Sequence, residues 1–436
     1  MKESKEAGKV HLVGIGGIGV SALARYFLSK GWDVSGSDAS DHPELRGMGV
    51  RIFKGHSEKN VPEDLDILVY SPAVPEDNPE IVKAETENVR VLSYPQALGE
   101  ITERYYTVAV SGTHGKSTTT SMIALALEEA GFDPTVIVGT KLKEFGGTNF
   151  KKGNSSYLVI EADEFKAALL NYSSDVAVVT NIEEDHLDFY KDIDDIISTF
   201  KKYTKENLNQ EGCLIINEDD ENAPLLKKVF PGKVARYSLK DEETKELNLS
   251  IPGRHNLSNA LAAWKACLEL GAEKEKILKA LSAFTGTWRR FEEKDVVTEK
   301  GEVRIINDYA HHPTELKSTL QAAREKYPRE KLVAVFQPHQ YERTYHLFEG
   351  LRKAISSAET DEFLITDIYT VKGRESEDIK RRVSARMLCE KTKNASYAGS
   401  LRDTKKKLLK VLQGGEVVVI MGAGDVGGLE RMISKF

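Results

Sequence analysis

Two glycine-rich segments carry residue types at spacings that bind phosphate groups. In the first, Gly14, Gly16 and Gly19 form the pattern G-x-G-x-x-G directly after a short apolar segment, and Asp38 lies further along. Such glycines allow a tight turn and close backbone approach to a pyrophosphate, while the next helix offers its N-terminal amides. Asp38 suits a ribose diol, as in NAD sites. A sugar nucleotide has the same pyrophosphate and ribose, so the pattern predicts a nucleotide site for either ligand.

The second segment, residues 111–118, reads Ser-Gly-Thr-His-Gly-Lys-Ser-Thr and lies between an apolar run and a helical pattern. It departs from the strict G-x-x-x-x-G-K-[ST] motif because residue 110 is valine. Its amides would cradle phosphates, Lys116 would reach the β and γ phosphates, and the Ser117 hydroxyl would hold Mg²⁺. A dehydrogenase has no use for this triphosphate site, so two such segments favour another enzyme class.

Acidic clusters follow two further apolar segments of the same region. They are Glu161-Ala-Asp163-Glu164 and residues 181–186, Asn-Ile-Glu-Glu-Asp-His. Carboxylates at the carboxyl ends of parallel strands can hold Mg²⁺ against substrate phosphates. Glu161 is the strongest of these candidates, although acidic loops are often merely solvated. His186 is also compatible with a capping or core role, because imidazole is a poor Mg²⁺ ligand.

Four later segments hold polar side chains that suit substrate binding. Asn256 and Asn259 are three residues apart on one helix face, and Asn256 could instead be a plain N-cap. Arg289 and Arg290 would reach a γ-phosphate once domains close, the alternative being a surface salt bridge. Residues 307–313 and 336–344 are polar loops that each follow a strand, which indicates a small polar partner for the last domain.

The elements that must position these residues alternate between strands and helices. We expect strands at 9–13, 33–36, 66–70, 105–110, 157–160, 176–180, 213–216, 303–306, 332–336, 362–366 and 416–421. We expect helices at 18–30, 117–130, 256–270, 274–284, 314–327 and 345–357, and a solvated surface stretch at 239–249. This rhythm predicts an α/β protein of three domains, 1–104, 105–285 and 286–436.

Composition limits the classes of function. Lys and Arg number 61 against 68 Asp and Glu, a net charge of -7, which is unsuited to wrapping nucleic acid. No apolar run approaches the roughly 18 residues of a membrane span. Residues 1–9 lack the apolar region of a signal peptide, and Cys213, Cys267 and Cys389 lack metal-site spacing. We therefore expect a cytoplasmic protein that binds neither nucleic acid nor membrane.

Taken in order, these motifs resemble those of the Mur ligase family. The matching segments are 14–19 (GIGGIG), 112–116 (GTHGK), 161–164 (EADE), 180–186 (TNIEEDH), 253–256 (GRHN), 289–291 (RRF), 308–315 (DYAHHPTE), 337–339 (QPH) and 421–425 (MGAGD). Any one of these segments is a weak signal, whereas the ordered set covers almost the whole chain and is highly specific.

The resemblance implies a Rossmann-like N-terminal domain for a uridine nucleotide, a central P-loop ATPase-type α/β domain and a Rossmann-like C-terminal domain for an amino acid. It is nearest to the branch that joins L-alanine to UDP-N-acetylmuramate with ATP and Mg²⁺, which Mn²⁺ can replace, as a monomer or homodimer. Residues implied to bind the UDP substrate are Gly14, Gly16, Gly17, Ile18, Gly19, Asp38 and Ser71. Those implied to bind ATP are Gly112, Thr113, His114, Gly115, Lys116, Ser117, Thr118, Asn256, Asn259 and Asp308.

The resemblance also implies catalytic, metal and amino-acid residues. Lys116, Glu161, His186, Arg290 and His311 would be catalytic; Ser117, Glu161 and His186 would hold metal; His312, His339 and Arg343 would hold the amino acid. Two departures bear on specificity: Phe165-Lys-Ala-Ala168 follows Glu164 in place of the usual Ser-Asp, and Gln340 replaces a basic residue. Lys201 and Lys202 lie near the spacing of a carbamylated lysine that this branch typically lacks, so neither is assigned that role.

Three alternative functions remain open on the sequence. One is a related ligase that uses another amino acid or a recycled murein peptide. The second is an NAD-dependent oxidoreductase built on the Gly14 motif, and the third is a nucleotide sensor that has lost catalysis.

Overall fold

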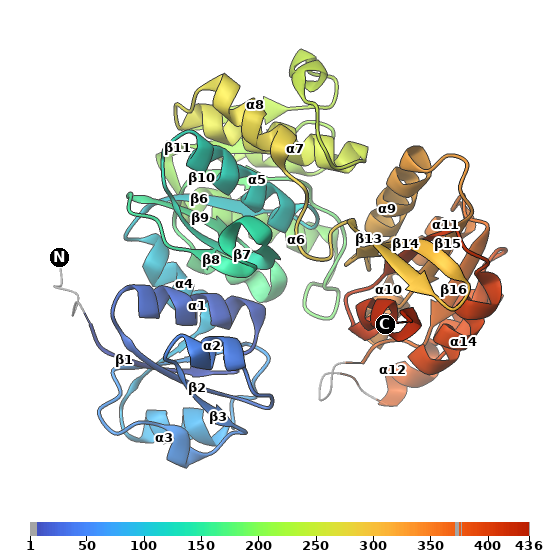
Figure 1. Cartoon of the computed structure of the whole chain (residues 1–436). Coiled ribbons are helices and arrows are strands. Elements are labelled where there is room, and N and C mark those ends of the chain that lie inside the picture. Colours follow the sequence, from blue (N-terminus) through green and yellow to red (C-terminus); the bar gives the residue numbers. More distant parts are fainter. Residues whose placement is uncertain (1–6, 371–374, 376, 436) are drawn as a thin grey trace.

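The computed structural model describes residues 7–370, 375 and 377–435, and it arranges them around three β-sheets (Figure 1). Each sheet is covered by helices on both faces, the three-layer arrangement expected of parallel strands with helical connections. The α/β class and the three-domain fold expected from the sequence are confirmed. No helix among the described residues is both long and apolar enough to cross a bilayer.

The first sheet is five-stranded and parallel, in the order β3-β2-β1-β4-β5. Its strands are β1 (Lys9–Val13), β2 (Asp33–Asp38), β3 (Arg51–Lys54), β4 (Ile67–Tyr70) and β5 (Arg90–Ser93). Its helices are α1 (Ile18–Ser29), α2 (Pro43–Gly47), α3 (Pro79–Thr86) and α4 (Tyr94–Thr102), with the 3₁₀ turn η1 (Glu58–Asn60). Chain order reverses between β1 and β4, and ligands of such sheets bind at that point.

The second sheet has seven strands in the order β12-β11-β10-β6-β9-β7-β8, and only β8 runs antiparallel to its neighbour. The strands are β6 (Tyr106–Ser111), β7 (Thr135–Leu142), β8 (Thr148–Lys151), β9 (Tyr157–Glu161), β10 (Ser174–Val179), β11 (Leu208–Asn217) and β12 (Lys233–Tyr237). The helices are α5 (Lys116–Glu129), α6 (Ile193–Glu206), α7 (Arg254–Glu269) and α8 (Lys274–Ala283). Shorter 3₁₀ segments are η2 (Lys143–Phe145), η3 (Phe165–Asn171), η4 (Ala223–Lys228) and η5 (Glu242–Glu246).

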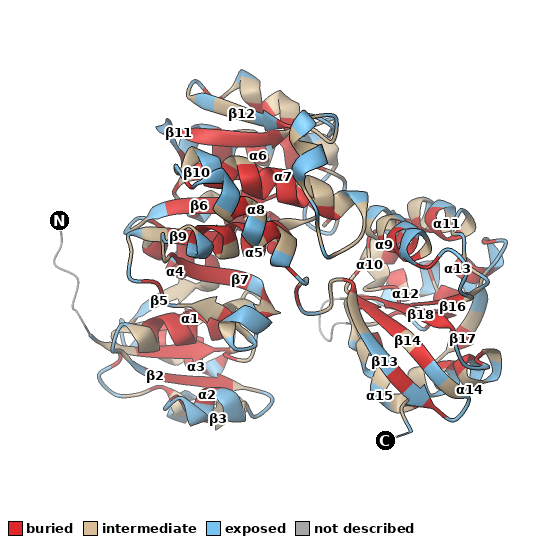
Figure 2. Ribbon diagram, turned by 45° about the horizontal axis from the view of Figure 1, so that its top comes forward, coloured by how far each residue is buried: buried red, intermediate tan, exposed pale blue. Residues whose placement is uncertain are grey.

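The two faces of this sheet belong to different hydrophobic cores, because successive side chains of a strand point to opposite faces. In β6, Val108 and Val110 pack with α5, α7 and α8. Ala109 between them belongs to a core that includes α6 and continues into the first sheet through α1. One hydrophobic core therefore continues from the first sheet to the second. The inner strands of both sheets are largely buried, as their red colour in Figure 2 shows.

The third sheet has six strands in the order β13-β14-β18-β15-β16-β17, with β13 antiparallel at one edge. The strands are β13 (Glu292–Thr298), β14 (Gly301–Asp308), β15 (Leu332–Phe336), β16 (Glu362–Thr366), β17 (Ser396–Gly399) and β18 (Val417–Met421). The helices are α9 (Pro313–Lys326), α10 (Tyr341–His346), α11 (Phe348–Ser356), α12 (Glu377–Arg382), α13 (Ala385–Glu390), α14 (Leu401–Val411) and α15 (Leu429–Ile433), with η6 (Asp425–Gly428).

Most of the expected elements are present within a few residues of their expected bounds, with one helix wrong. The single helix expected at 345–357 is two, α10 and α11, because the chain turns at Leu347, which caps both. The edge strands β3, β5, β8, β12, β13 and β17 and the inner strand β7 were not expected. The charged stretch 239–249 is a surface excursion in which no residue is buried, and all three cysteines are free and buried.

Candidate functional site

The polar loops of the second sheet meet because the strands before them are neighbours. β10, β6 and β9 are adjacent and parallel, so the loops that follow them leave the same edge of the sheet. The glycine-rich loop 112–115 follows β6, the acidic cluster follows β9, and residues 181–186 follow β10. The amide of His114 donates to Asn181 Oδ1 at 2.8 Å, which ties two of these loops together.

Gly115 is the residue that turns the glycine-rich loop into helix α5. It is the N-cap of α5 with φ +83°, a left-handed conformation that favours glycine. A Cβ atom here would also lie 2.3 Å from Oδ1 of Asn259 on α7. The loop and Asn259 are therefore in close contact, and only glycine permits it.

Lys116 points into the loop and meets the acidic cluster. Its Nζ donates to Glu164 at 2.8 Å and to the Gly112 carbonyl at 2.7 Å. Burial by itself lowers the pKa of Lys116, but the carboxylates of Glu164, Asp163 and Glu161 raise it above its usual range. The ammonium group is therefore charged at neutral pH and positioned by Glu164.

A cavity of about 270 Å³ lies between the second and third sheets, beside the glycine-rich loop. It brings together polar residues that are far apart in the sequence. Among its lining residues are His114, Gly115, Thr118, Asn181, Glu183, His255, Asn256, Asn259, Arg290, Asp308, Thr314 and Glu315. The lining thus contains six residues expected to bind ATP and one, Arg290, expected to be catalytic. Lys116 and Ser117 do not line this cavity.

The simpler roles considered above for Asn256 and Arg290, a helix N-cap and a surface salt bridge, are both wrong. Asn256 is not the N-cap of α7, because Gly253 holds that position, and the Asn256 Nδ2 atom donates to the Pro252 carbonyl at 2.7 Å. Arg290 does not form a surface salt bridge. Its Nη1 lies 3.2 Å from Glu315, which is 10% exposed, and its guanidinium sits over the ring of Tyr309.

Burial alters the protonation of two groups beside this cavity. Asp308 accepts the amides of Phe291 and Ala310, yet burial raises its pKa to about 6. Burial lowers the pKa of His311 to about 4, so the ring is neutral at pH 7. The Nδ1 atom of His311 donates to the Tyr309 carbonyl at 3.0 Å, since a carbonyl can only accept. Nε2 is therefore the ring nitrogen without a proton.

The residues expected to bind metal are distributed around Lys116. His186 forms a group with Asp163 and Glu164, whose possible ligand atoms all lie within 4.8 Å of one another. Glu161 is outside that group, and its carboxylate accepts the Gly139 amide at 2.8 Å. Ser117 lies in the first turn of α5, next to Lys116.

The expected amino-acid residues lie across the domain interface from His186. Arg343 of α10 donates through Nε to Asp185 at 2.9 Å, and its Nη2 lies 3.3 Å from His186 Nδ1. Its Nη1 lies 3.2 Å from His339 Nδ1, and the His339 ring stacks on Tyr369 at 5.5 Å. Gln340, which has φ +64°, is the N-cap of α10. His312 caps α9 by accepting the Thr314 amide.

The first glycine-rich segment lies in the first sheet, at the point where its chain order reverses. The amides of Gly14 and Ile15 donate to the Ser37 carbonyl, and the Gly16 amide donates to Asp38 at 2.9 Å. Gly19 lies under Tyr94, since a Cβ there would be 2.6 Å from its ring. Ser71 touches the loop from β4, 3.0 Å from the position of a Cβ on Gly14. Gly17 is the N-cap of α1, and Ile18 is the first helical residue.

Three residues that hold this site together, Glu164, Asp185 and Glu315, are not among the assigned site residues, although the first two belong to the acidic clusters. Glu315 accepts the amides of His311 and His312 and also pairs with Arg290. Its signal was present, because an acidic residue three positions after an N-cap marks a capping box. The partners of Glu164 and Asp185 leave no comparable local pattern.

Comparison with known proteins adds an independent result. Three family models match in order: "Mur ligase family, catalytic domain" at 9–106, "Mur ligase middle domain" at 110–245 and "Mur ligase, glutamate ligase domain" at 289–424. Together they span most of the chain.

Curated relatives match over nearly their full length. A UDP-N-acetylmuramate–L-alanine ligase of Acetivibrio thermocellus is 39% identical, over 98% of this chain and 95% of that protein. One of Clostridium tetani is 38% identical, over 96% of each. Among solved structures, the UDP-N-acetylmuramate-alanine ligase MurC of Thermotoga maritima is 30% identical with a TM-score of 0.79, over 98% of both chains.

Proposed function

Because the chain belongs to the Mur ligase family, we propose that it joins L-alanine to UDP-N-acetylmuramate at the expense of ATP, in the synthesis of peptidoglycan precursors. The observation that carries this proposal is the cavity beside the glycine-rich loop. It is lined jointly by α5, α7 and α9, from two domains, and it holds the asparagines, Arg290 and Asp308 together. An ATP-dependent ligase needs such a shared space, because ATP must meet a second substrate.

We assign one ligand to each domain, with the boundaries 1–104, 105–285 and 286–436. The UDP-substrate would lie at the Gly14 loop, where Gly14, Gly16, Gly17, Ile18, Gly19, Asp38 and Ser71 gather. ATP would occupy the cavity, with Asn256 and Asn259 beside adenine and Asp308 beside the ribose. L-Alanine would lie near His312, His339 and Arg343, of which His312 and Arg343 contact the middle domain.

The reaction runs in two steps whose atoms balance. A lactyl carboxylate oxygen attacks the γ-phosphorus, and ADP leaves, which creates an acyl phosphate. The alanine nitrogen then attacks the acyl carbon, and the tetrahedral intermediate expels phosphate and releases a proton to leave an amide. The first step brings a carboxylate and a triphosphate together, so the charges of Lys116 and Arg290 and the loop amides stabilise the transferring phosphoryl group.

Mg²⁺ fits the acidic cluster on the middle domain. Asp163 and Glu164 offer carboxylate oxygens next to His186, and oxygen is the donor that this ion prefers. We propose Ser117, Glu161 and His186 as its ligands. The carboxylates of Asp163 and Glu164 lie beside His186. When bound, the ion neutralises phosphate charge.

Water must be kept from the acyl phosphate, and the contacts between the domains serve this purpose. Thr314 Oγ1 donates to Glu183 at 2.6 Å, and His312 Nε2 donates to the Glu184 carbonyl at 3.0 Å. With the Arg343–Asp185 pair, these bonds close α9 and α10 onto the loop after β10.

The test is phosphate release by the purified protein with UDP-N-acetylmuramate, ATP and Mg²⁺. The amino component is varied among alanine, serine, glycine and the murein tripeptide. Release that requires both the sugar nucleotide and alanine supports the proposal. A preference for serine or glycine would revise the amino acid, and release with the tripeptide alone would make the protein a recycling ligase. Reduction of NAD without phosphate release would refute the proposal.

A further inference from the structure

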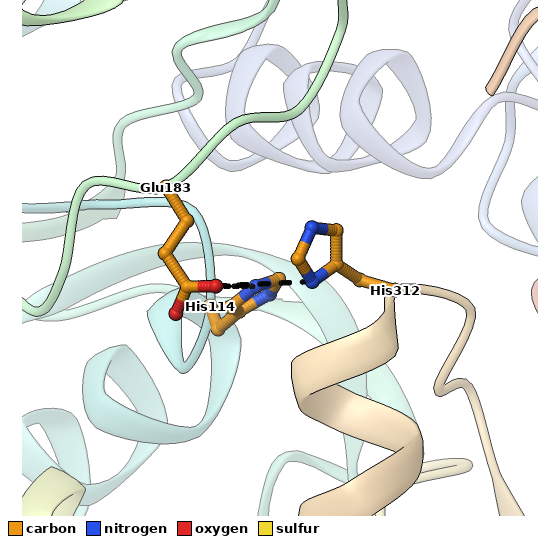
Figure 3. Close-up of side chains that lie close together, drawn as sticks. All are labelled: His114, Glu183 and His312. Carbon is orange, nitrogen blue, oxygen red and sulfur yellow. Dashed lines mark ion pairs between the residues drawn. The ribbon is translucent and has the colours of Figure 1, made fainter. Parts of the chain in front are cut away.

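A second group of possible metal ligands lies apart from the acidic cluster around Lys116. It consists of His114 from the glycine-rich loop, Glu183 from the loop after β10, and His312 at the start of α9, and it is drawn in Figure 3. One ligand atom from each lies within 4.8 Å of the others. The group combines two histidines and a carboxylate, and it spans two domains.

Each histidine turns one ring nitrogen toward Glu183 and the other toward a separate oxygen. Nε2 of His114 lies 3.8 Å from the Glu183 carboxylate, and Nδ1 of His312 lies 4.0 Å from the same oxygen. On the other side, His114 Nδ1 faces Glu315 at 3.4 Å. His312 Nε2 meets the Glu184 carbonyl at 3.0 Å. Metal-binding histidines are held in this way, with the second ring nitrogen bound to a carboxylate or a carbonyl.

The bond to Glu184 determines which nitrogen of His312 carries the proton. A carbonyl only accepts, so Nε2 donates and Nδ1 keeps its lone pair. That lone pair accepts the Thr314 amide at 3.3 Å, and the Glu183 carboxylate lies 4.0 Å from the same nitrogen. Nε2 of His114 is buried and forms no hydrogen bond within the described part of the chain. A cation between the three groups would give His114 Nε2 a partner, and it would take the His312 lone pair in place of the Thr314 amide.

The donor set selects the kind of cation. Two imidazoles and one carboxylate suit Zn²⁺ and similar transition metals, whereas Mg²⁺ prefers oxygen ligands. Zinc–ligand bonds of about 2.0–2.2 Å put the ligand atoms of a tetrahedral site roughly 3.4 Å from one another. The two ring nitrogens and the Glu183 oxygen therefore need to move only slightly closer together. The carboxylates of Glu183 and Glu315 carry two negative charges, which would balance the charge of a divalent cation.

We propose that His114, Glu183 and His312 form a site for a divalent transition metal such as Zn²⁺, separate from the Mg²⁺ ligands. The fourth position is open to a water molecule or a phosphate oxygen, because His114 and Glu183 also line the cavity between the domains. Since the ligands come from the middle and C-terminal domains, the bound ion holds the two domains together. Glu315 is a positioning residue that orients His114.

The proposal is tested by titrating Co²⁺ into the metal-free full-length protein in excess Mg²⁺, which occupies oxygen-rich sites. Tetrahedral Co²⁺ absorbs visible light far more strongly than octahedral Co²⁺, so the spectrum reports the donor set directly. We expect intense bands that saturate at one ion per chain and disappear on addition of Zn²⁺. Zn²⁺ should also raise the melting temperature of the wild-type protein.

Variants assign the bands to this group. Glu183→Gln and His312→Asn should abolish them, and Glu315→Gln should weaken Co²⁺ binding about 10- to 100-fold, as outer residues of metal sites do. His186→Asn, in the other group, should leave them unchanged. Circular dichroism checks that each variant is folded. Bands that persist in Glu183→Gln or vanish in His186→Asn would overturn the proposal, as would the absence of saturable binding to the wild-type protein.

Discussion

Arg343 and Asp185 are separated by 158 residues in the chain and form a buried ion pair between the middle and C-terminal domains. Nε of Arg343 lies 2.9 Å from Oδ1 of Asp185, and Nη2 lies 3.4 Å from Oδ2. Burial by itself raises the pKa of Asp185, but Arg343 and the neighbouring histidines hold it well below its usual range. The pair therefore stays charged at every physiological pH and holds α10 against the loop after β10.

Replacing this arginine with lysine tests whether it binds the amino acid. Arg343→Lys keeps the charge but loses the planar fork that can hold a carboxylate with two hydrogen bonds. We expect the KM for alanine to rise about 10- to 100-fold, as for the loss of charged hydrogen bonds worth about 1.5–3 kcal/mol. Initial rates at varied alanine measure this.

The control is Arg352→Lys, on the exposed side of α11, which pairs only with Glu349 among the described residues and should not change the rates. A rise in the KM for ATP or the sugar nucleotide with an unaltered KM for alanine would contradict the assignment.

Removing the ammonium group of the glycine-rich loop separates two of the proposed sites. Lys116→Ala should lower kcat about 1000-fold or more, because a preorganised charge at the transferring phosphoryl group is lost. Binding of UDP-N-acetylmuramate, measured by calorimetry, should be unchanged, since the Gly14 loop is on another sheet. Lys202→Ala, on the surface of α6, serves as the control. Equal loss of binding and turnover would show that the domain allocation is wrong.

The close approach of Gly115 to Asn259 predicts that a single methyl group damages the ATP site. Gly115→Ala adds backbone strain of about 1–3 kcal/mol and also places Cβ 2.3 Å from Asn259. We expect a large increase in the KM for ATP together with a lower melting temperature.

Gly131→Ala separates the two effects. Gly131 has φ +86°, close to that of Gly115, but no atom lies within 4 Å of a Cβ there. This variant should lose stability and keep its KM for ATP. If both variants bind ATP equally well, the contact with Asn259 does not matter for binding.

A buried carboxylate supports the first glycine-rich loop and gives it a pH dependence. Glu80 is fully buried, and although burial raises its pKa, hydrogen bonds involving His11, Ser37 and Asn60 lower it to about 2. Ser37 in turn accepts the amides of Gly14 and Ile15. The stabilisation is complete above the unfolded pKa of 4.5 and is lost as the pH falls toward 2.

Glu80→Gln should therefore destabilise the first sheet at pH 7 by about 2–3 kcal/mol. Hydrogen exchange of β1 and β2 amides measures this, and the difference from wild type should shrink as the pH falls below 4.5. Glu85→Gln, exposed on the same helix, is the matched control. A difference that is constant with pH would exclude Glu80 as the source.

The sequence by itself determined the class of fold and the identity of most candidate residues. Glycine-rich turns, the lysine after Gly115 and the acidic clusters are local patterns, because a phosphate site is built from consecutive backbone amides at one helix start. The order of these patterns was enough to identify the family. Edge strands such as β8 and β13 have weaker signals, since they are only partly buried.

Only the tertiary structure decided which of these residues meet. Sheet order places β10, β6 and β9 side by side, and no local pattern encodes that order. Glu315 pairs with Arg290 within the C-terminal domain, and closure of α9 and α10 onto the middle domain pairs Asp185 with Arg343. It also brings His114 within reach of His312. Burial between two domains changes the partners and the pKa values of these groups, and burial depends on how the whole chain packs.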